Sequence, residues 1–187
     1  RAQGRGLVGI KSNNGAVVGH RSLDHLGSAA YGPLLKDITD SRIENNRLSG
    51  KTFCLRAEGA NRVMVSGNAF LWNGWALRLM ADGTADTVRA NRFIGNTFDV
   101  ATNSTSNSGT FTENYCDRYS GYDLGHDGFG DLPFPPIRLF SLIAQQQPPA
   151  LILLRSPFAD LLDIAERVLP VLTPETLIDR RPRMRIP

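Results

Sequence analysis

The chain has 187 residues, enough for one domain with a sizeable hydrophobic core. Apolar residues make up 41% and charged residues 21%, a composition typical of a globular protein. The net charge of +3 is too small to indicate a nucleic-acid partner. The sequence contains no run of 18 apolar residues, so it predicts no membrane-spanning helix. Cys54 and Cys116 have no CxxC spacing, so they predict no zinc site and leave the redox compartment open.

The first 39 residues show only traces of a pattern. Residues 1–16 are rich in glycine and have no clear period. The stretch "VVGHRSLDHL" (17–26) fits one coil of a repeat, with Val18 and Leu23 as its apolar positions and Arg21 where later coils have asparagine. The following "GSAAYGPLLKD" (27–37) predicts a longer turn within that coil.

A repeat is clear over residues 40–116. Its markers are four asparagines spaced by 22, 23 and 23 residues: Asn46, Asn68, Asn91 and Asn114. Apolar residues stand three places before each asparagine (Ile43, Val65, Val88, Phe111) and two places after it (Leu48, Phe70, Phe93, Cys116). Apolar and polar positions alternate, which is the period of a strand with one buried face. Short strands that recur every 22–23 residues predict an all-β, right-handed parallel β-helix.

The asparagines then form a structural ladder. An asparagine at a bend between two strands tolerates left-handed backbone angles. When asparagines stack on successive coils, each amide donates to one neighbour and accepts from the other, so a polar group turned inward stays satisfied. We therefore expect the four side chains on one face of the coil.

The repeat ends in "NYCDRYSGYDLGHDGFGDLPF" (114–134), where aromatic residues are followed by acids and glycines. Asp123, Asp127 and Asp131 take positions 1, 5 and 9 of an EF-hand-like calcium loop, but position 12 is Phe134 rather than glutamate. The segment is interpreted either as a cap that closes the solenoid or as a site for a hard cation.

Beyond residue 134 the pattern changes to helix. Ser156 can cap a helix that starts at Pro157 and ends before Pro170. Its predicted apolar stripe consists of Phe158, Leu161, Leu162, Ala165, Val168 and Leu169. This tail (135–187) either folds back on the β-helix (1–134) or docks on a membrane or a membrane partner.

The junction resembles the NosD family of periplasmic accessory proteins. The matching positions are Asn114, Tyr115, Tyr119, Gly121, Tyr122, Asp123, Asp127, Gly128, Gly130, Asp131 and Pro133, together with "LLRSPFADLL" and "RPRM" in the tail. Cys116 replaces a family tryptophan and falls in the inward apolar column, so it is expected to be a smaller core residue. Family members are longer, so this chain is expected to be a C-terminal portion with further coils before Arg1.

The resemblance implies a non-enzymatic protein that assists copper-site maturation of nitrous-oxide reductase. Its implied partners are the permease and ATPase of an ABC transporter, a copper chaperone and the reductase, with no nucleic acid. Its implied location is periplasmic, with peripheral membrane association through the partner. The apolar stripe of the tail, with Arg181 and Arg183, would dock on the permease. Deleting residues 150–187 is then expected to leave the coil folded and to abolish membrane association.

The implied cofactor is transient copper, or less favourably calcium. Cu(I) prefers sulfur and imidazole ligands, for which His25, Met64 and Met80 are candidates. The alternative function is a carbohydrate-binding or carbohydrate-active β-helix, that is, a lyase, hydrolase or epimerase. Such enzymes need converging carboxylates. Glu44 stacks in sequence register on Ser66 and Arg89, and no column holds two acids, so we expect no glycan-cleaving activity.

Overall fold

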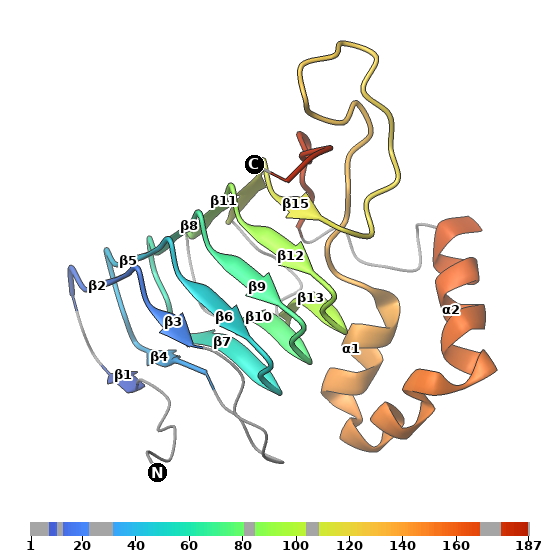
Figure 1. The fold of residues 1–187 in the computed structure, drawn as a ribbon. Coiled ribbons are helices and arrows are strands. Elements are labelled where there is room, and N and C mark those ends of the chain that lie inside the picture. Colours follow the sequence, from blue (N-terminus) through green and yellow to red (C-terminus); the bar gives the residue numbers. More distant parts are fainter. Residues whose placement is uncertain are drawn as a thin grey trace.

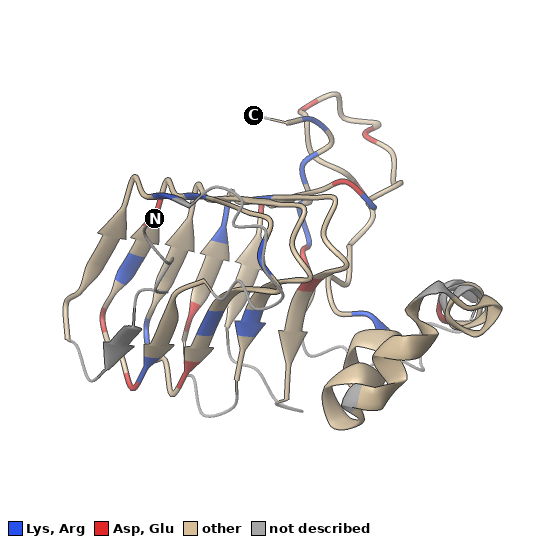
Figure 2. Cartoon of the chain, turned by 60° about the horizontal axis from the view of Figure 1, so that its bottom comes forward, with Lys and Arg blue, Asp and Glu red and all other residues tan. Residues whose placement is uncertain are grey.

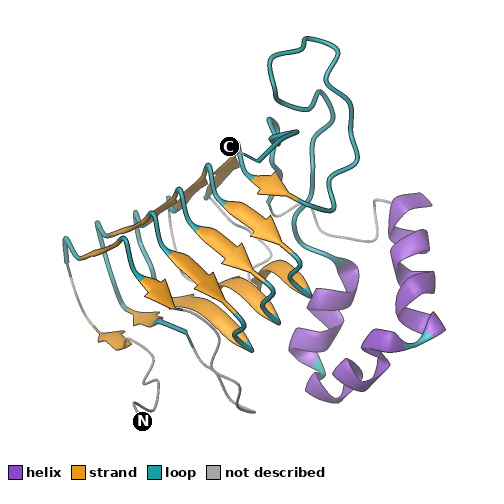
Figure 3. Ribbon diagram, viewed as in Figure 1, coloured by secondary structure: helices purple, strands orange, loops and turns teal. Residues whose placement is uncertain are grey.

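The computed structural model describes residues 8–10, 13–22, 32–80, 85–103, 109–168 and 177–186. The chain coils into a parallel β-helix of three sheets (Figures 1 and 3). Residues 114–134, which we call the closing segment, follow the last full coil and lead into a helical arm. Every pairing between the strands is parallel. The fold predicted from the repeat is therefore confirmed. Basic and acidic residues are interspersed along the coils (Figure 2).

Each coil contributes one strand to each sheet. The first sheet contains β1 (Val8–Ile10), β4 (Leu34–Lys36), β7 (Phe53–Glu58), β10 (Trp75–Leu79) and β13 (Phe98–Thr102). The second contains β2 (Ala16–Val18), β5 (Arg42–Glu44), β8 (Met64–Ser66), β11 (Thr87–Arg89) and β14 (Thr110–Thr112). The third contains β3 (Arg21–Ser22), β6 (Arg47–Ser49), β9 (Ala69–Leu71), β12 (Arg92–Ile94) and β15 (Tyr115–Cys116).

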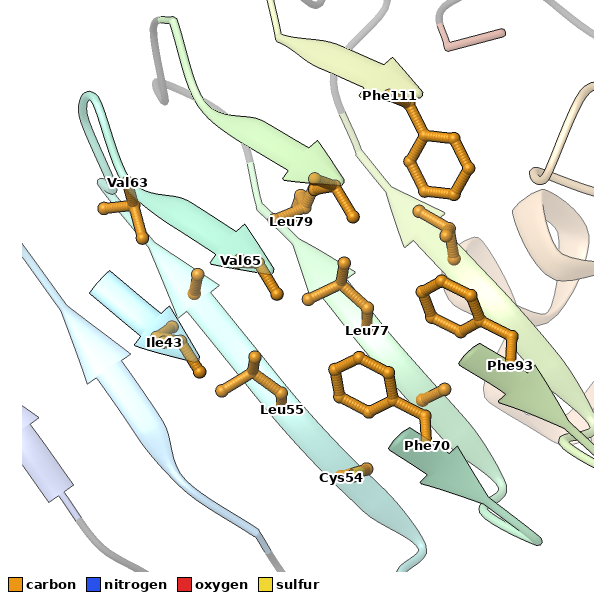
Figure 4. Close-up of a cluster of buried hydrophobic side chains, with 14 of the residues drawn as sticks. Ile43, Cys54, Leu55, Val63, Val65, Phe70, Leu77, Leu79, Phe93 and Phe111 are labelled. Atoms are coloured by element: carbon orange, nitrogen blue, oxygen red, sulfur yellow. The ribbon is translucent and has the colours of Figure 1, made fainter. Parts of the chain in front are cut away.

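The core fills the interior of the coil with columns of like residues (Figure 4). Phe70 and Phe93 are register partners on β9 and β12, and their rings stack with centroids 5.0 Å apart. Ile43, Val65 and Val88 form a second column. These are the columns predicted from sequence, and stacking buries each side chain against its counterpart on the next coil. Cys116 is buried at the end of its column, as expected.

The first coil is one residue out of the predicted register. Val17, not Val18, pairs with Ile43, and Val18 is 57% exposed. Arg21 pairs with Arg47, so His20 occupies the asparagine position, where its backbone N–H donates to Asn46 Oδ1. This coil spans 26 residues instead of 22 or 23, and its longer turn hides the register in the sequence. Leu23 lies outside the described residues.

The asparagines form a continuous hydrogen-bonded ladder. Each Nδ2 donates to the Oδ1 of the next coil, from Asn46 to Asn68 (2.9 Å), from Asn68 to Asn91 (3.0 Å) and from Asn91 to Asn114 (3.0 Å). The Oδ1 atoms of Asn68, Asn91 and Asn114 also accept the backbone N–H of the preceding asparagine. All four side chains are buried, so the ladder satisfies groups that water cannot reach.

The left-handed backbone angle predicted for these asparagines belongs to the residue before each of them. Asn45, Gly67, Ala90 and Glu113 have φ between 53° and 64°. The bend is made one position earlier, because the asparagine itself must turn its amide into the coil to reach its counterparts. The prediction of the left-handed position was wrong by one residue.

A second, shorter ladder runs through Asn73 and Asn96. Asn73 Oδ1 accepts the backbone N–H of Lys51, and Asn73 Nδ2 donates to Asn96 Oδ1 at 3.0 Å. Asn96 Nδ2 in turn donates to the carboxylate of Asp99 at 3.2 Å. All three of these polar side chains are buried.

The main ladder ends on a residue from the far end of the chain. Asp179 is fully buried, and its carboxylate accepts the backbone N–H groups of Glu113 and Asn114 and the Nδ2 of Asn114. Isolated antiparallel bridges join Asp179 to Phe134 and Arg183 to Phe129, so residues 177–186 lie against the closing segment (Figure 1). Deleting residues 150–187 would remove this cap, and the expectation that the coil stays intact without them is not supported.

Tyr119 fixes the closing segment. Its hydroxyl donates to the carbonyl of Leu132 at 2.8 Å, and its ring packs edge-on against Phe134. A Cβ at Gly121 or at Gly130 would lie 2.0 Å from the Tyr119 hydroxyl oxygen. The glycines of this segment therefore make room for the tyrosine.

A helical arm follows, with α1 (Leu139–Gln146), a 3-10 helix η1 (Pro148–Arg155) and α2 (Pro157–Val168). The predicted start of α2 at Pro157 is confirmed. The arm attaches to the outer face of the coil, where Phe140 of α1 stacks on Phe98 at 6.1 Å. Phe98 in turn packs on Trp75 at 4.2 Å. Phe140 thus extends the outer aromatic row of Trp75 and Phe98. The arm to which it belongs lies beside the C-terminal end of the coil (Figure 3).

Candidate functional site

Five large apolar side chains of the helical arm, two on η1 and three on α2, are exposed. They are Ile152 (86% exposed), Leu153 (40%), Phe158 (46%), Leu161 (60%) and Ile164 (58%). We call these five residues the arm face. Such a concentration of large apolar side chains on one segment is characteristic of an interaction surface rather than of scattered exposure.

The structure places the predicted apolar stripe on two sides of α2. Phe158 and Leu161 are exposed, whereas Leu162 and Ala165 are half-buried and Ala159 is buried. Leu162 packs toward the cluster formed by Trp75, Phe98 and Phe140. The side chains of Val168 and Leu169 lie outside the described residues. Ile152 and Ile164 were missed, although Ile164 stands three residues after Leu161, on the same helical face.

The predicted docking arginines contact the chain's own closing segment. The guanidinium of Arg181 lies 4.1 Å from the Phe129 ring centroid and 3.3 Å from Asp127 Oδ2. That of Arg183 lies 5.1 Å from the same ring, and its Nε donates to the carbonyl of Glu113. These contacts give both arginines a role in holding residues 177–186 on the end of the coil. Their role in docking stays a prediction.

The three candidate calcium carboxylates bind backbone groups of their own loop. Asp123 accepts the N–H groups of Asp127 and Gly128, Asp127 accepts that of Phe129, and Asp131 accepts that of Leu124. In the described ranges, no three His, Cys, Asp or Glu side chains form a group that could hold a metal ion. The carboxylates thus stabilise the turns of the closing segment.

The candidate copper ligands do not come together within the part of the chain that the structure describes. Met64 lies on the outer side of β8, 42% exposed. Met80 follows β10 in another sheet, and its sulfur accepts a hydrogen bond from Gln145 of α1 at 3.5 Å. Burial raises the pKa of the Cys54 thiol, which makes it a poor ligand. His25 lies outside the described residues.

A cleft of about 460 Å³ separates the last coil from the helical arm. Its lining includes Asp117 and Arg118 from the coil and Arg138 and Phe140 from the arm. Arg118 donates to the carbonyls of Asn96 and Thr97, which fixes its side chain across the end of the third sheet. The cleft is the space left where the arm diverges from the coil.

Two buried acids make the stability of the coil depend on pH. Burial raises the pKa of Asp86 to about 6, although the bond from the Val63 N–H lowers it. Burial likewise raises the pKa of Asp99 to about 6, against lowering contributions from Arg118 and Asn96. Both folded pKa values lie above the ordinary value of 3.8, so the folded protein binds the two protons more tightly than the unfolded chain does.

The contribution of these two acids to the free energy of unfolding should therefore be most favourable below about pH 4 and should be lost as pH rises through about 6. Asp86→Asn keeps an oxygen for the Val63 N–H and removes the cost of ionisation. We expect it to raise stability by roughly 1–2 kcal/mol at pH 7.5 and to change it little at pH 4.5. Urea melts at both pH values measure this, and an equal effect at the two would contradict the assignment.

No helix in the described part of the chain has both the length and the apolar character needed to span a bilayer.

Comparison with known proteins gives consistent matches. A family model described as "Periplasmic copper-binding protein (NosD)" matches residues 2–120. A "Probable ABC transporter binding protein NosD" of Pseudomonas aeruginosa is 30% identical over 190 residues, covering 91% of this chain and 43% of the relative. A protein of the same description from Stutzerimonas stutzeri is 26% identical over 196 residues, covering 95% and 44%. The chain spans less than half the length of these relatives.

Proposed function

The chain belongs to the NosD family of periplasmic copper-binding proteins, and on that premise we propose that it is part of a non-enzymatic accessory protein of an ABC transporter. Its role would be to assist copper-site maturation of nitrous-oxide reductase in the periplasm, with copper as cargo. Its partners would be the permease and ATPase subunits, a copper chaperone and the reductase. Both relatives carry a name that refers to binding an ABC transporter, which supports the first of these partners.

The arm face is the observation that carries the proposal. It projects from the end of the coil on a segment that is itself anchored through Phe140 and Leu162. A rigid support with apolar residues on its free side suits attachment to an apolar surface of a membrane subunit. We assign docking to this face, in which Leu161 and Ile164 are the two most exposed apolar residues of α2.

The register of the coils supports a role without catalysis. Glu44 stacks on Ser66, which stacks on Arg89, so this column holds one acid. Asp40 is paired with Arg62 of the next coil at 2.6 Å. Glycan-cleaving β-helices need two or three carboxylates that converge on the substrate, and these columns do not supply them.

Copper would be held elsewhere than at the candidate residues. Among the described side chains, both cysteines are buried in the core and the two methionines that were candidates belong to different sheets. The described part of this donor set does not fit a copper site, so the copper contact is assigned to residues outside the described ranges or to a partner.

The docking role is tested with the double variant Leu161→Glu and Ile164→Glu in the full-length protein, expressed with its permease and ATPase. Two charges on an apolar contact should lower the membrane-bound fraction at least about tenfold, because each buried side chain of this size contributes about 2 kcal/mol. Quantitative immunoblots of washed membranes measure the fraction.

A matched control is Leu124→Glu, since Leu124 is 76% exposed on the closing segment, away from the arm. It should leave the membrane-bound fraction unchanged. Point variants are preferred to a deletion because they leave Asp179 in place. A double variant that stays on membranes in the wild-type amount would show that docking does not use the arm face.

A further inference from the structure

Two arginines lie side by side on the outer face of the first sheet. Arg56 on β7 and Arg78 on β10 are register partners, so the parallel pairing holds their backbones about 4.8 Å apart. Both residues are half-buried. Like charges on directly opposed positions repel each other, so the pair is unfavourable for the sheet alone.

Aromatic rings fix the position of Arg78. Its guanidinium carbon lies 5.1 Å from the Phe53 ring centroid and 5.2 Å from that of Trp75. The two rings stack on neighbouring strands. Burial lowers the pKa of Arg78, and Arg56 lowers it further. The guanidinium is thus held in place, partly desolvated, by cation–π contacts.

Both arginines have an unused donor. The Nε atoms of Arg56 and Arg78 are buried and have no hydrogen-bond partner, and within the described part of the chain they are the only buried side-chain nitrogen or oxygen atoms in this state. A buried donor without an acceptor is costly, and because both Nε atoms are closed to solvent, an incoming group can contact the two guanidiniums only through their terminal N–H groups.

The surrounding charges favour an incoming anion. Glu58 is ion-paired with Arg56 through its Oε1. Lys36, the register partner of Glu58 on β4, is exposed. Three cations therefore stand around one carboxylate on this face, which leaves an excess of positive charge.

We propose that Arg56 and Arg78 form a receptor for carboxylate side chains of an acidic protein segment that docks on the outer face of β7 and β10. A guanidinium presents its N–H groups as a planar fork that matches a carboxylate. A sugar ring is disfavoured, because Trp75 is 5% exposed and Arg78 already covers its ring. Glu58 beside the pair disfavours a doubly charged phosphate.

A titration with hexaglutamate peptide at low ionic strength tests this, with the arginine Nε–H signals followed by NMR and hexaglutamine as the neutral control. Saturable shifts of the Arg56 and Arg78 signals are expected with hexaglutamate only. The double variant Arg56→Lys and Arg78→Lys keeps the charges and loses the forks, and should bind at least about tenfold more weakly. Arg47→Lys, an exposed change on β6, should bind as the wild type does.

Absence of shifts with hexaglutamate would overturn the proposal. Equal shifts with inorganic phosphate or with trigalacturonate at the same concentration would also overturn it, in favour of a phosphate or a sugar acid. A second variant, Arg56→Met with Arg78→Met, separates binding from folding. Its urea midpoint should stay close to that of the wild type, because the removal of the unpaired buried donors offsets the loss of the Arg56–Glu58 ion pair and of the cation–π contacts of Arg78. A lowered midpoint would assign the arginines to the fold instead.

Discussion

Replacing Asp179 with alanine should lower the free energy of unfolding by roughly 3 kcal/mol or more, as measured in urea melts at pH 7.5. The carboxylate accepts the backbone N–H groups of Glu113, Asn114 and Arg181 at 3.2, 2.9 and 2.9 Å, and the Nδ2 of Asn114 at 3.3 Å. Alanine removes this acceptor from three backbone N–H groups beside a buried position, whereas the Nδ2 of Asn114 keeps the carbonyls of Val88 and Thr112 as acceptors. It also detaches residues 177–186 from the end of the coil.

Two further variants, one conservative and one at an exposed neighbour, show whether the loss comes from the Asp179 carboxylate. Asp179→Asn keeps the shape and one acceptor oxygen but turns an NH₂ group toward N–H donors, so an intermediate loss is expected. Arg180→Ala changes an exposed neighbour and should alter stability by no more than about 0.5 kcal/mol. If Asp179→Ala cost no more than Arg180→Ala, the cap would contribute nothing to the fold.

The substitution Asn91→Leu should lower the free energy of unfolding by roughly 2–3 kcal/mol. Leucine has the same branched shape and the same number of side-chain heavy atoms as asparagine and is larger in volume, so the variant loses hydrogen bonds and creates no cavity. The backbone N–H and the Nδ2 of Asn68 lose the Oδ1 of Asn91, and the carbonyl of Val65 loses its donor at 2.8 Å. Asn91 is fully buried, so water cannot replace these bonds.

Thr110→Leu is the matched control, because Thr110 is exposed on β14 and receives the same new side chain. It should change the free energy of unfolding by no more than about 0.5 kcal/mol. Equal midpoints for Asn91→Leu and wild type in the same melts would mean that solvent takes over the ladder contacts.

The sequence predicted the coils well because every coil repeats the same residue types in the same order. A spacing of 22 or 23 between asparagines, with apolar residues at constant offsets, fixes both the period and the register. The first coil has neither signal, since His20 joins the ladder through its backbone N–H, which every residue but proline possesses. Its register could therefore not be predicted from side-chain types.

Contacts between distant segments were beyond the sequence pattern. Asp179 stands in an arginine-rich tail and reaches Asn114 across 65 residues, with no repeat to mark it. The helical period predicted where α2 begins but not which side of α2 is buried, because apolar residues occur on both its buried and its exposed side. Ala159 is buried, and Leu162 is half-buried because it packs toward the cluster of Trp75, Phe98 and Phe140. Leu161 and Ile164 are exposed.

The asparagine ladder has a direction. Every side-chain NH₂ group points toward the C-terminal end and every amide oxygen points back, so the amide dipoles add up in series and strengthen one another. The positive end of the row meets Asp179, and the shorter row of Asn73 and Asn96 meets Asp99. The carboxylate at the end of each row therefore interacts with the positive end of a row of dipoles, as an anion does at the N-terminus of an α-helix. An inner position must both accept and donate, which an amide can do and a carboxylate cannot. An ionised acid at an inner position could not donate to the next coil and would interrupt the hydrogen-bonded row. At the last position no further donation along the row is needed, so the acid can accept the final hydrogen bond.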